Sequence, residues 1–474
     1  MRRWIFILLL VCAATAAVLA QSPAIVQLAG EASTQRLKTN LYFLASDQLE
    51  GRLMASHGDT LASQFVADVF RKAHLLAPYD KGANYFQSVV AIRNDVVKEV
   101  FSINGKLYGR WDGWLYQGQL ADVPESPLVF ASANTPDSLF LELLKQDVKG
   151  KAIVLPLPVI IGALQGNKMD SLQSVLAHDG VRMIIFKHPS FDGATAAFKA
   201  HDFLPRYVDS MYKDEEDAMP VFALSEQRFN ELTPGSTVAA QILKQNVNVV
   251  APNVIGILPG SDPRAPCVIL SAHHDHDGRN GPTIYYGAVD NASGTVALLE
   301  VARLMDLAVK KGFRPKRTIV FASYTGEERG LLGSAYFAQH PVYPISDTYA
   351  VLNVDMLGRV DTFYSGRRPD SNYVYILVKD SLDRGLRQAV YKANDSSVHM
   401  ILDTHYEDPQ FSQRRIRGSD QYPFYLKGVP FVRIDCGFTK DYHQPTDTPD
   451  KVDYDLLTRQ TKLVFLTLWN MANK

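Results

Sequence analysis

Four apolar runs in the C-terminal half of the chain each lead directly into an acidic or histidine residue. "CVILSA" (267–272) precedes His273, and "RTIVFASYT" (317–325) precedes the loop "GEERG" at 326–330. "TYAVLNV" (348–354) precedes Asp355, and "PFVRIDCGF" (430–438) precedes the loop that holds His443. Continuous apolar runs between loops and helical stretches are typical of parallel strands covered on both faces. The pattern predicts an α/β fold: a mostly parallel mixed sheet flanked by helices, with these side chains meeting at its carboxyl edge.

Imidazole and carboxylate groups are the ligands that zinc and related ions take without a thiolate. A fifth candidate is Asp290, in a loop that leads into a helix at 285–305. Five ligands with one bridging carboxylate would give each of two ions three protein ligands and an open position for water. The candidates are His273, Asp290, Asp355, His443 and one of the adjacent pair Glu327 and Glu328.

The adjacent glutamates Glu327 and Glu328 suggest two roles at one site. One would bind metal, and the other would take the proton from a metal-activated water, which requires a carboxylate that is not itself a ligand. The spacing alone does not decide which glutamate has which role.

The balance of charged residues and the N-terminal segment indicate which partners and which cellular location to expect. The chain has 474 residues, with 49 Lys and Arg against 50 Asp and Glu, so no basic surplus indicates nucleic-acid binding. The segment "MRRWIFILLLVCAATAAVLA" (1–20) has two arginines, a short apolar run and small residues, as a signal peptide does. We therefore expect a secreted or periplasmic protein with no stable membrane span after cleavage. The two cysteines that follow it, Cys267 and Cys436, are expected to be buried apolar residues.

The pattern of predicted helices and strands changes twice after residue 20. Residues 21–99 contain two predicted helices with apolar positions at helical spacing, such as Leu37, Leu41 and Leu44. Residues 100–245 contain short β-like runs, among them "KAIVLPLPVII" at 151–161. Residues 246–474 alternate strands and helices. The prediction is one catalytic unit built from 21–99 and 246–474, with a β-rich domain inserted between them.

The motifs together resemble the co-catalytic dizinc exopeptidases, which include bacterial leucyl-type aminopeptidases and the glutamate-carboxypeptidase and transferrin-receptor relatives. The resemblance covers about 250–455 and rests on five motifs in order. The segment "LASDQLEGR" (44–52) is similar to the N-terminal part of the same unit, and 100–245 looks like the protease-associated domain inserted in many members. The five motifs are "SAHHDHDG", "GAVDNASG", "GEERGLLGSAYF", "NVDMLGR" and "DYHQPTDTPDKVD".

The resemblance implies a role for each residue. His273 and Asp355 would bind one Zn²⁺ ion, Glu328 and His443 the other, and Asp290 would bridge them. Glu327 would be the general base. Asp275 would orient His273, and Tyr442 is the candidate donor to the developing oxyanion.

The implied function is a dizinc aminopeptidase that removes N-terminal residues from peptides through a metal-bound hydroxide. Alternatives on the same scaffold are a carboxypeptidase or dipeptidase, and a glutaminyl cyclase. An inactive receptor-like relative is the non-enzyme alternative, although such relatives usually lack ligands that this chain keeps. Peptides are the expected partners, and a homodimer is left open.

Several neighbouring residues have a plainer interpretation. We expect His274 and His276 to be loop or rim residues, Asp277 to belong to a turn, and Asp447 to turn or cap the chain before the last helix. The arginines at 414, 415 and 417 are expected in a solvated loop. Their alternative is recognition of a substrate carboxylate, for which arginine offers a planar fork.

Overall fold

The computed structural model describes residues 22–109, 111–117, 121–165, 169–195, 206–209, 219–363 and 372–474. The predicted signal peptide, 1–20, lies outside them. The chain forms two compact units: the described residues up to Val90 with Val250–Lys474, and Ala91–Val249. These boundaries differ from the predicted 100 and 245 by nine and four residues, and each falls within a long strand. Among the described helices, none combines the length and apolar character needed to span a membrane.

The first unit contains a mixed sheet whose centre is parallel. The pairs β14–β17, β10–β14 and β10–β13 are parallel, whereas β9 and β15 pair antiparallel with β13 and β17. This confirms the predicted mostly parallel mixed sheet. In spatial order the strands are β16 (Ile401–Asp403), β15 (Tyr373–Lys379), β17 (Phe431–Asp435), β14 (Thr348–Val354), β10 (Cys267–His273), β13 (Ile319–Tyr324) and the C-terminal part of β9 (Thr237–Leu258).

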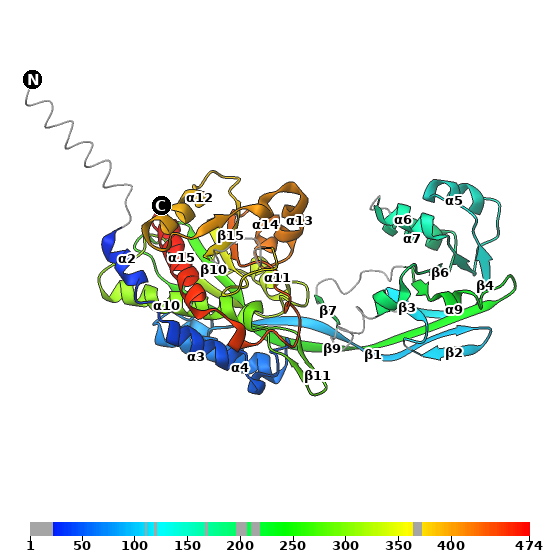
Figure 1. Ribbon diagram of the computed structural model, residues 1–474, viewed down its shortest axis with the longest axis horizontal. Coiled ribbons are helices and arrows are strands. Elements are labelled where there is room, and N and C mark those ends of the chain that lie inside the picture. The colour runs from blue at the N-terminus through cyan, green and yellow to red at the C-terminus, as the bar shows by residue number, and fades with distance from the viewer. Residues whose placement is uncertain are drawn as a thin grey trace, which may run out of the picture. The chain divides into compact units, whose positions relative to one another are not determined.

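Helices cover both faces of this sheet, which explains why its central strands are apolar throughout (Figure 1). Val268 and Leu270 of β10 join one core, and Cys267 and Ile269 join the other. The first core is completed by α2 (Pro23–Ala29), α3 (Thr34–Leu44), α4 (His57–Lys72), α10 (Gly294–Lys310), α12 (Leu386–Ala393) and α15 (Tyr454–Ala472). The second is completed by α11 (Leu332–Gln339), α13 (Pro409–Arg417) and α14 (Tyr422–Leu426).

Short elements complete the first unit. The small hairpin is β11 (Gly278–Asn280) with β12 (Thr283–Tyr285). The single helical turns are η1 (Asp47–Leu49), η2 (Asp80–Gly82), η4 (Ala288–Ser293), η5 (Ile345–Asp347), η6 (Asn394–Val398), η7 (His405–Glu407) and η8 (Pro449–Lys451).

The two helices predicted near the N-terminus are α3 and α4. Each begins at a serine, Ser33 or Ser56, whose hydroxyl accepts a hydrogen bond from a backbone N–H of the first turn. The expected apolar positions Leu37, Leu41 and Leu44 are all buried against the sheet core.

In the second unit the strand order is β9, β4, β5, β6, β8, β3, and β1 pairs with β2, β7 and β9. The strands are β1 (Phe86–Ile103), β2 (Lys106–Gly109), β3 (Trp114–Gln117), β4 (Ala121–Phe130), β5 (Ala152–Val154), β6 (Met183–Lys187), β7 (Arg206–Asp209) and β8 (Val221–Leu224). The helices are α5 (Pro136–Leu143), α6 (Leu157–Gln165), α7 (Met169–His178) and α9 (Glu226–Phe229).

One run in this unit that was predicted to be a strand is a strand over only part of its length. Only Ala152–Val154 of "KAIVLPLPVII" is strand, and Leu157–Gln165 is helix α6. Pro156 and Pro158 cannot donate to a strand ladder, but a proline fits the first turn of a helix, where its missing N–H is not needed. Burial of Val159 and Ile160 in the core beside α5 and α7 overrides their weak helix propensity. The resemblance of this unit to a protease-associated domain remains a prediction.

Candidate active site

The predicted site residues meet at the carboxyl edge of the first unit's sheet. His273 is the last residue of β10, and Asp355 directly follows β14. Glu327 and Glu328 lie in the loop after β13, and Asp290 lies in η4, just before α10. His443 lies in the loop between β17 and η8. Residues separated by up to 170 positions are brought together because neighbouring parallel strands end at one edge.

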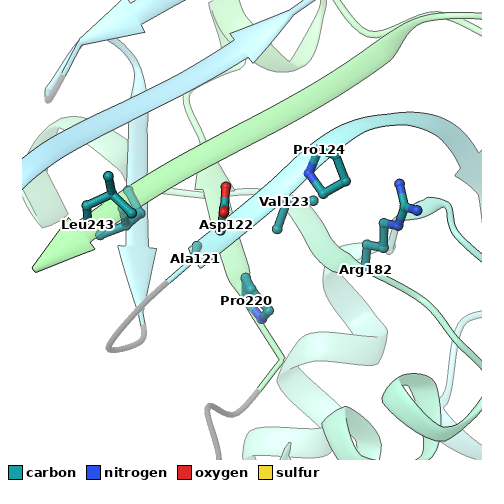
Figure 2. Close-up of a pocket in the computed structure, with 8 residues that line it drawn as sticks. Ala121, Asp122, Val123, Pro124, Arg182, Pro220 and Leu243 are labelled. Carbon is teal, nitrogen blue, oxygen red and sulfur yellow. The ribbon is translucent and has the colours of Figure 1, made fainter.

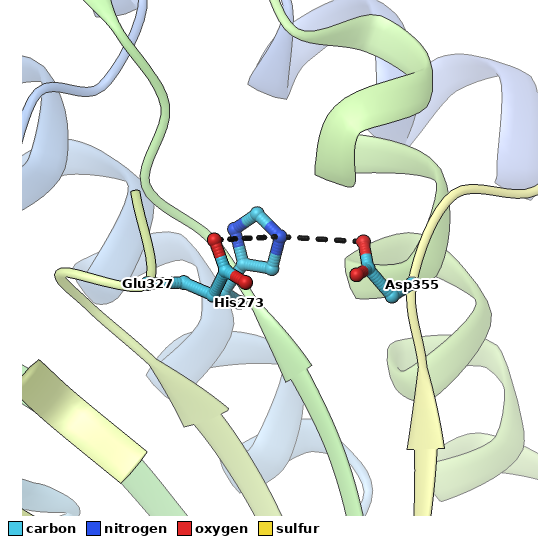
Figure 3. A group of neighbouring side chains, drawn as sticks. All are labelled: His273, Glu327 and Asp355. Atoms are coloured by element: carbon cyan, nitrogen blue, oxygen red, sulfur yellow. Dashed lines mark ion pairs between the residues drawn. The ribbon is translucent and has the colours of Figure 1, made fainter. Parts of the chain in front are cut away.

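His273 lies at the centre of the first group of side chains. Its Nε2 atom is 3.4 Å from Asp290 Oδ1, 3.4 Å from Asp355 Oδ1 and 4.0 Å from Glu327 Oε2. Figure 3 shows the His273 ring between the carboxylates of Glu327 and Asp355. One side-chain nitrogen thus faces three carboxylates that come from different loops.

His443 lies at the centre of the second group. Its Nε2 atom is 3.1 Å from Asp290 Oδ2 and 3.2 Å from Glu328 Oε2. Asp290 therefore presents one oxygen to His273 and the other to His443, which is the arrangement that a bridging carboxylate requires.

The donor set fits divalent metal. Three overlapping groups of potential ligand atoms each lie within 4.8 Å of one another: His273–Glu327–Asp355, His273–Asp290–Glu328 and Asp277–Glu328–His443. His273 Nε2 and Asp355 Oδ1 are buried, and neither makes a hydrogen bond with any described residue. Burying such atoms without a partner is costly, and an ion among them removes that cost. The nitrogen and oxygen donors suit zinc in particular.

The pKa values of the two adjacent glutamates, Glu327 and Glu328, are shifted in opposite directions. Burial raises the pKa of Glu327 well above its usual value, with Glu328 and Asp355 adding to the effect against the pull of His273. Burial acts on Glu328 in the same direction, but His443 and His276 outweigh burial and hold its pKa well below the usual value. Two neighbouring carboxyl groups whose pKa values are shifted in opposite directions suit different chemical roles.

The histidines of the cluster attract protons for the same reason. Burial disfavours the charged ring of His273, but the surrounding carboxylates, Glu327 foremost, raise its pKa well above the usual value. The pKa of His443 is raised to about 12, because Glu328 and Asp290 outweigh burial. Without metal, protons on these rings balance the clustered negative charge.

Asp275 and Tyr442 both lie at the site. His273 Nδ1 is 3.3 Å from the main-chain oxygen of Asp275 and 3.6 Å from its carboxylate Oδ1. That carboxylate oxygen accepts a hydrogen bond from the main-chain N–H of Glu327 at 3.1 Å, so Asp275 ties the two together. The Tyr442 ring packs on the His443 ring, with centroids 4.0 Å apart.

Three residues that were expected to belong to a loop, rim or turn are buried beside the cluster. His274, His276 and Asp277 are all 0% exposed. His276 Nδ1 is 2.7 Å from Glu328 Oε1, and Asp277 Oδ2 is 3.3 Å from His443 Nδ1. His274 and His276 lie in the loop after β10, as expected, but they are not rim residues, because that loop folds inward.

The loop that carries Asp290 is fixed by a residue 157 positions away. Asp447, expected to turn or cap the chain before the last helix, instead accepts hydrogen bonds from the main-chain N–H groups of Val289 and Asp290. Asp453 caps that helix, α15. Gly287 allows the loop its path, since a Cβ there would lie 2.4 Å from the His276 ring.

Arg52 of the "LASDQLEGR" segment supports both metal-facing loops. Its guanidinium is fully buried and donates to the main-chain oxygens of His274 (2.7 Å), Tyr286 (2.8 Å) and Gly287 (2.9 Å), and to Leu44 O (2.5 Å). The N-terminal helices are thereby fastened to the two loops that hold the histidine and aspartate ligands.

A cavity of about 130 Å³ opens on the cluster. Carboxylates of the cluster form part of its wall, and arginines form another part. The lining residues are Asp290, Glu327, Asp355, Met356, Arg414, Arg415, Gly418, Arg433, Phe438 and Tyr442.

The arginines of this wall contradict the expectation of a solvated loop. Arg415 lies on α13, is 4% exposed and pairs with Asp435 at 2.5 Å. Arg433, which the sequence showed only as part of an apolar run, pairs with Asp435 and Asp355, each at 3.0 Å. Arg414 is exposed, in agreement with the expectation for that residue.

The second unit has a larger hollow of different character, about 430 Å³ in volume (Figure 2). Asp122 and Arg182 are the charged residues in its lining, which otherwise includes Pro124, Pro220 and Leu243. The groups of potential metal-ligating side chains found among the described residues all lie in the first unit.

The fold and donor set together define a class of protein, the α/β metallohydrolases, in which loops at a sheet's carboxyl edge hold the ions. Within that class, residues 253–468 match the model of Peptidase family M28.

Curated relatives match less than half of the chain. A probable zinc metalloprotease of Pyrenophora tritici-repentis is 28% identical over 46% of this chain and 56% of its own length. Aminopeptidase NAALADL1 of Rattus norvegicus is 36% identical over 42% of this chain and 28% of its own. The probable glutamate carboxypeptidase AMP1 of Arabidopsis thaliana is 37% identical over 40% and 25%. The chain spans about half the length of the first of these relatives.

Solved structures share the fold over nearly the whole chain. An aminopeptidase from Aneurinibacillus sp. strain AM-1 superposes with a TM-score of 0.60 and 16% identity, covering 95% of this chain and 96% of that one. BSAP, a zinc aminopeptidase from Bacillus subtilis, gives a TM-score of 0.57 and 17% identity, covering 94% and 96%.

Proposed function

We propose that the protein is a dizinc aminopeptidase, exported from the cell, that removes N-terminal residues from peptides. The observation that carries the proposal is the convergence of two histidines and three carboxylates, beside a separate buried carboxyl group, on one small cavity. Export is proposed from the signal-like segment 1–20.

His273, Asp290 and Asp355 would hold one Zn²⁺ ion, and Asp290, Glu328 and His443 the other. Bound zinc lowers the pKa of a water molecule to about 7 and polarises a carbonyl group. Neighbouring residues orient the proposed ligands. Asp275 and Asp277 face the Nδ1 atoms of the two histidines, and His276 holds Glu328.

Glu327 is the proposed general base. It lies 4.0 Å from His273 Nε2, and burial raises its pKa, which favours the protonated form that a base takes between accepting and delivering a proton. Its Oε2 atom would take the proton from water and deliver it to the leaving amine. Tyr442, at the cavity wall, is the proposed donor to the scissile carbonyl oxygen.

The size of the cavity supports action at a chain end. Its volume of about 130 Å³ is well below the ~300–1,000 Å³ of sites that bury drug-sized ligands, so it suits one terminal residue. The carboxylates Asp290, Glu327 and Asp355 in its wall favour a free amine.

A second candidate is cleavage at a carboxyl terminus, which the arginines in the same wall favour. Three peptide sets separate the two, each with the zinc-loaded protein and mass-spectrometric products: C-terminally amidated peptides, N-acetylated peptides with a free carboxylate, and peptides with N-terminal glutamine. Loss of N-terminal residues from the amidated set is expected. Cleavage confined to the acetylated set, or cyclisation of glutamine without hydrolysis, contradicts the aminopeptidase proposal.

A further inference from the structure

Asp59, near the start of α4, is a fully buried carboxylate that has no part in the proposed chemistry. Its neighbours His57 and Thr60 are exposed, so the helix turns this acidic residue inward. The Oδ2 atom accepts a hydrogen bond from the main-chain N–H of Ala55 at 2.9 Å. A carboxylate that loses its water on burial needs further partners, and those partners indicate what the side chain does.

The Asp59 carboxylate contacts two residues that adjoin metal-facing segments of the chain. His274 Nε2 lies 3.2 Å from Asp59 Oδ1, and His274 directly follows the proposed ligand His273. Thr325 donates from Oγ1 to the same oxygen at 3.1 Å, and it directly precedes the loop 326–330. One side chain from an N-terminal helix therefore joins the end of β10 to the end of β13.

His274 is also held from the side of β13. Its Nδ1 atom lies 2.9 Å from the hydroxyl oxygen of Ser323, and its main-chain N–H donates to the oxygen of Tyr324 at 2.9 Å. Ser323 and Tyr324 are the last two residues of that strand. Both nitrogens of the buried His274 ring thus have a close partner, and rotation of the ring would lose at least one of them.

Thr325 is fixed by a second buried contact. Its main-chain N–H donates to Asn253 Oδ1 at 3.2 Å, and Asn253 Nδ2 donates to the main-chain oxygen of Gly333 at 2.8 Å and to Gln87 Oε1 at 3.0 Å. A Cβ on Gly333 would lie only 2.1 Å from the main-chain oxygen of Thr325, so the backbone is closely packed there. Asn253 and Thr325 are both 0% exposed. The start of the loop 326–330 is therefore held on two sides.

We propose that Asp59 is a positioning residue that fixes the spacing between His273 and the loop 326–330, which carries the two adjacent glutamates. The inference rests on the proposed function, in which these residues hold the ions and the base. Asp275 provides one link between the same segments, because its carboxylate accepts a hydrogen bond from the main-chain N–H of Glu327 at 3.1 Å. Asp59 provides a second link through side chains that are not proposed ligands.

Removing the charge of Asp59 tests the role at nearly constant shape. In the zinc-loaded Asp59→Asn protein, kcat is expected to fall about tenfold to a hundredfold, since small displacements of reacting groups are costly. KM should change by about twofold or less, because no substrate contact is removed. Asp68→Asn is the matched control, an exposed change on the same helix that should leave kcat unaltered. An unchanged kcat in Asp59→Asn, or an equal loss in both variants, overturns the inference.

Thr325 offers a test that leaves the carboxylate in place. Thr325→Val keeps the shape of the side chain and removes the hydroxyl that donates to Asp59, so kcat should fall in the same direction as in Asp59→Asn. Thr325→Ser restores the donor and should recover most of the lost turnover. A loss of kcat that is equal in the valine and serine variants contradicts the positioning role, because it then follows from packing alone.

A spectroscopic measurement separates this inference from the proposed function. Co²⁺ substituted for zinc absorbs visible light according to its coordination geometry, and reading the spectrum requires no turnover. Asp59→Asn and Thr325→Val are expected to shift the absorption bands of the bound Co²⁺, whereas Asp68→Asn and Thr325→Ser should match the unmodified protein. Shifted bands support the positioning role even if no peptide loses its N-terminal residue. Identical spectra for all four variants contradict it even if the protein is an active aminopeptidase.

Discussion

Asp277 Oδ2 lies 3.3 Å from Nδ1 of His443, so a fully buried carboxylate supports the ring whose Nε2 faces Asp290 and Glu328. Arg329 pairs with the other oxygen of Asp277. On the opposite side of the cluster, His273 Nδ1 faces both the main-chain oxygen and the carboxylate of Asp275. Each proposed histidine ligand is therefore oriented by an aspartate from the same "HHDHD" segment, 273–277.

Replacing Asp277 is expected to weaken one metal position more than the other. Asp277→Asn removes the negative charge behind His443, and loss of such a supporting group typically costs about 10–100-fold in metal affinity. Competition of the metal-free protein with a chromophoric chelator should show one zinc equivalent bound more weakly and one nearly unchanged. Asp450→Asn, at an exposed position in η8, which follows the loop that holds His443, should titrate like the unmodified protein. Identical titrations of both variants would contradict the supporting role.

The adjacent glutamates are expected to respond differently to the same substitution. Glu327→Gln removes the proposed base, so the turnover number should fall about 10²–10⁴-fold while zinc content stays unchanged. Glu328→Gln removes a proposed ligand, so zinc content should fall together with activity. Metal analysis by mass spectrometry alongside peptide assays distinguishes the two. Near-normal turnover by a zinc-loaded Glu327→Gln protein would refute the assignment of the base.

Zinc uptake is expected to release protons at neutral pH. In the metal-free protein the pKa of His443 is about 12 and that of His273 is raised well above its usual value, so both rings are protonated at pH 7. Binding zinc requires neutral rings, so apparent affinity should rise with pH through the neutral range. Calorimetry in two buffers of different ionisation enthalpy measures the protons released. Binding heats independent of buffer would show that the rings are already neutral.

The same shifts give the metal-free protein a distinct pH dependence. A histidine whose folded pKa is raised contributes stability that is fully present below its unfolded pKa, about 6.5, and is lost as pH rises through the folded pKa. Urea unfolding of the metal-free protein should therefore show less stability at pH 9 than at pH 6. His443→Gln should flatten this slope. An increase in stability over that interval would contradict the shifts.

Arg52 is expected to matter for stability although it touches no predicted metal ligand side chain. Arg52→Met fills similar volume but removes the donor from four carbonyl groups, three of them in buried hydrogen bonds. Unsatisfied buried groups cost about 1–3 kcal/mol each, so the free energy of unfolding should fall by at least about 3 kcal/mol. Arg71→Met, which removes an exposed pair with Asp68, should change it by about 0.5 kcal/mol or less. Urea titration followed by circular dichroism makes the comparison.

The sheet and its edge could be predicted because their signals are local. A buried parallel strand must be apolar along its length, so a charged or imidazole group at its end stands out, as His273, Asp355 and the glutamates do. Neighbouring strands then bring such groups together whatever their sequence separation. That is sufficient to predict the mixed sheet and to nominate the metal cluster.

The surroundings of the cluster could not be predicted in the same way. Arg433 lies within the apolar run "PFVRI", where nothing local indicates that its charge meets Asp435 and Asp355. His276 and Asp277 occupy a segment rich in turn residues, and only the inward path of the loop decides their burial. Arg415 was grouped with its neighbours, although helical geometry turns Arg415 inward while Arg414 and Arg417 stay exposed. Side-chain direction in irregular segments depends on tertiary contacts that a single sequence does not display.

Arg52 donates four hydrogen bonds to main-chain carbonyl groups, and three of these groups lie more than 200 residues later in the chain. The domain that holds the proposed metal ligands is therefore encoded by two separate segments of the gene. The family match begins at 253, yet the side chain that ties down the loops after β10 and before α10 is encoded two hundred codons earlier, ahead of the entire 91–249 unit. A recombination event or a cloning boundary placed at residue 253 would include every proposed metal ligand. It would omit Arg52 and the N-terminal helices. Any exchange or removal of the intervening unit has to rejoin residues 90 and 250 so that both parts of the domain stay on one polypeptide.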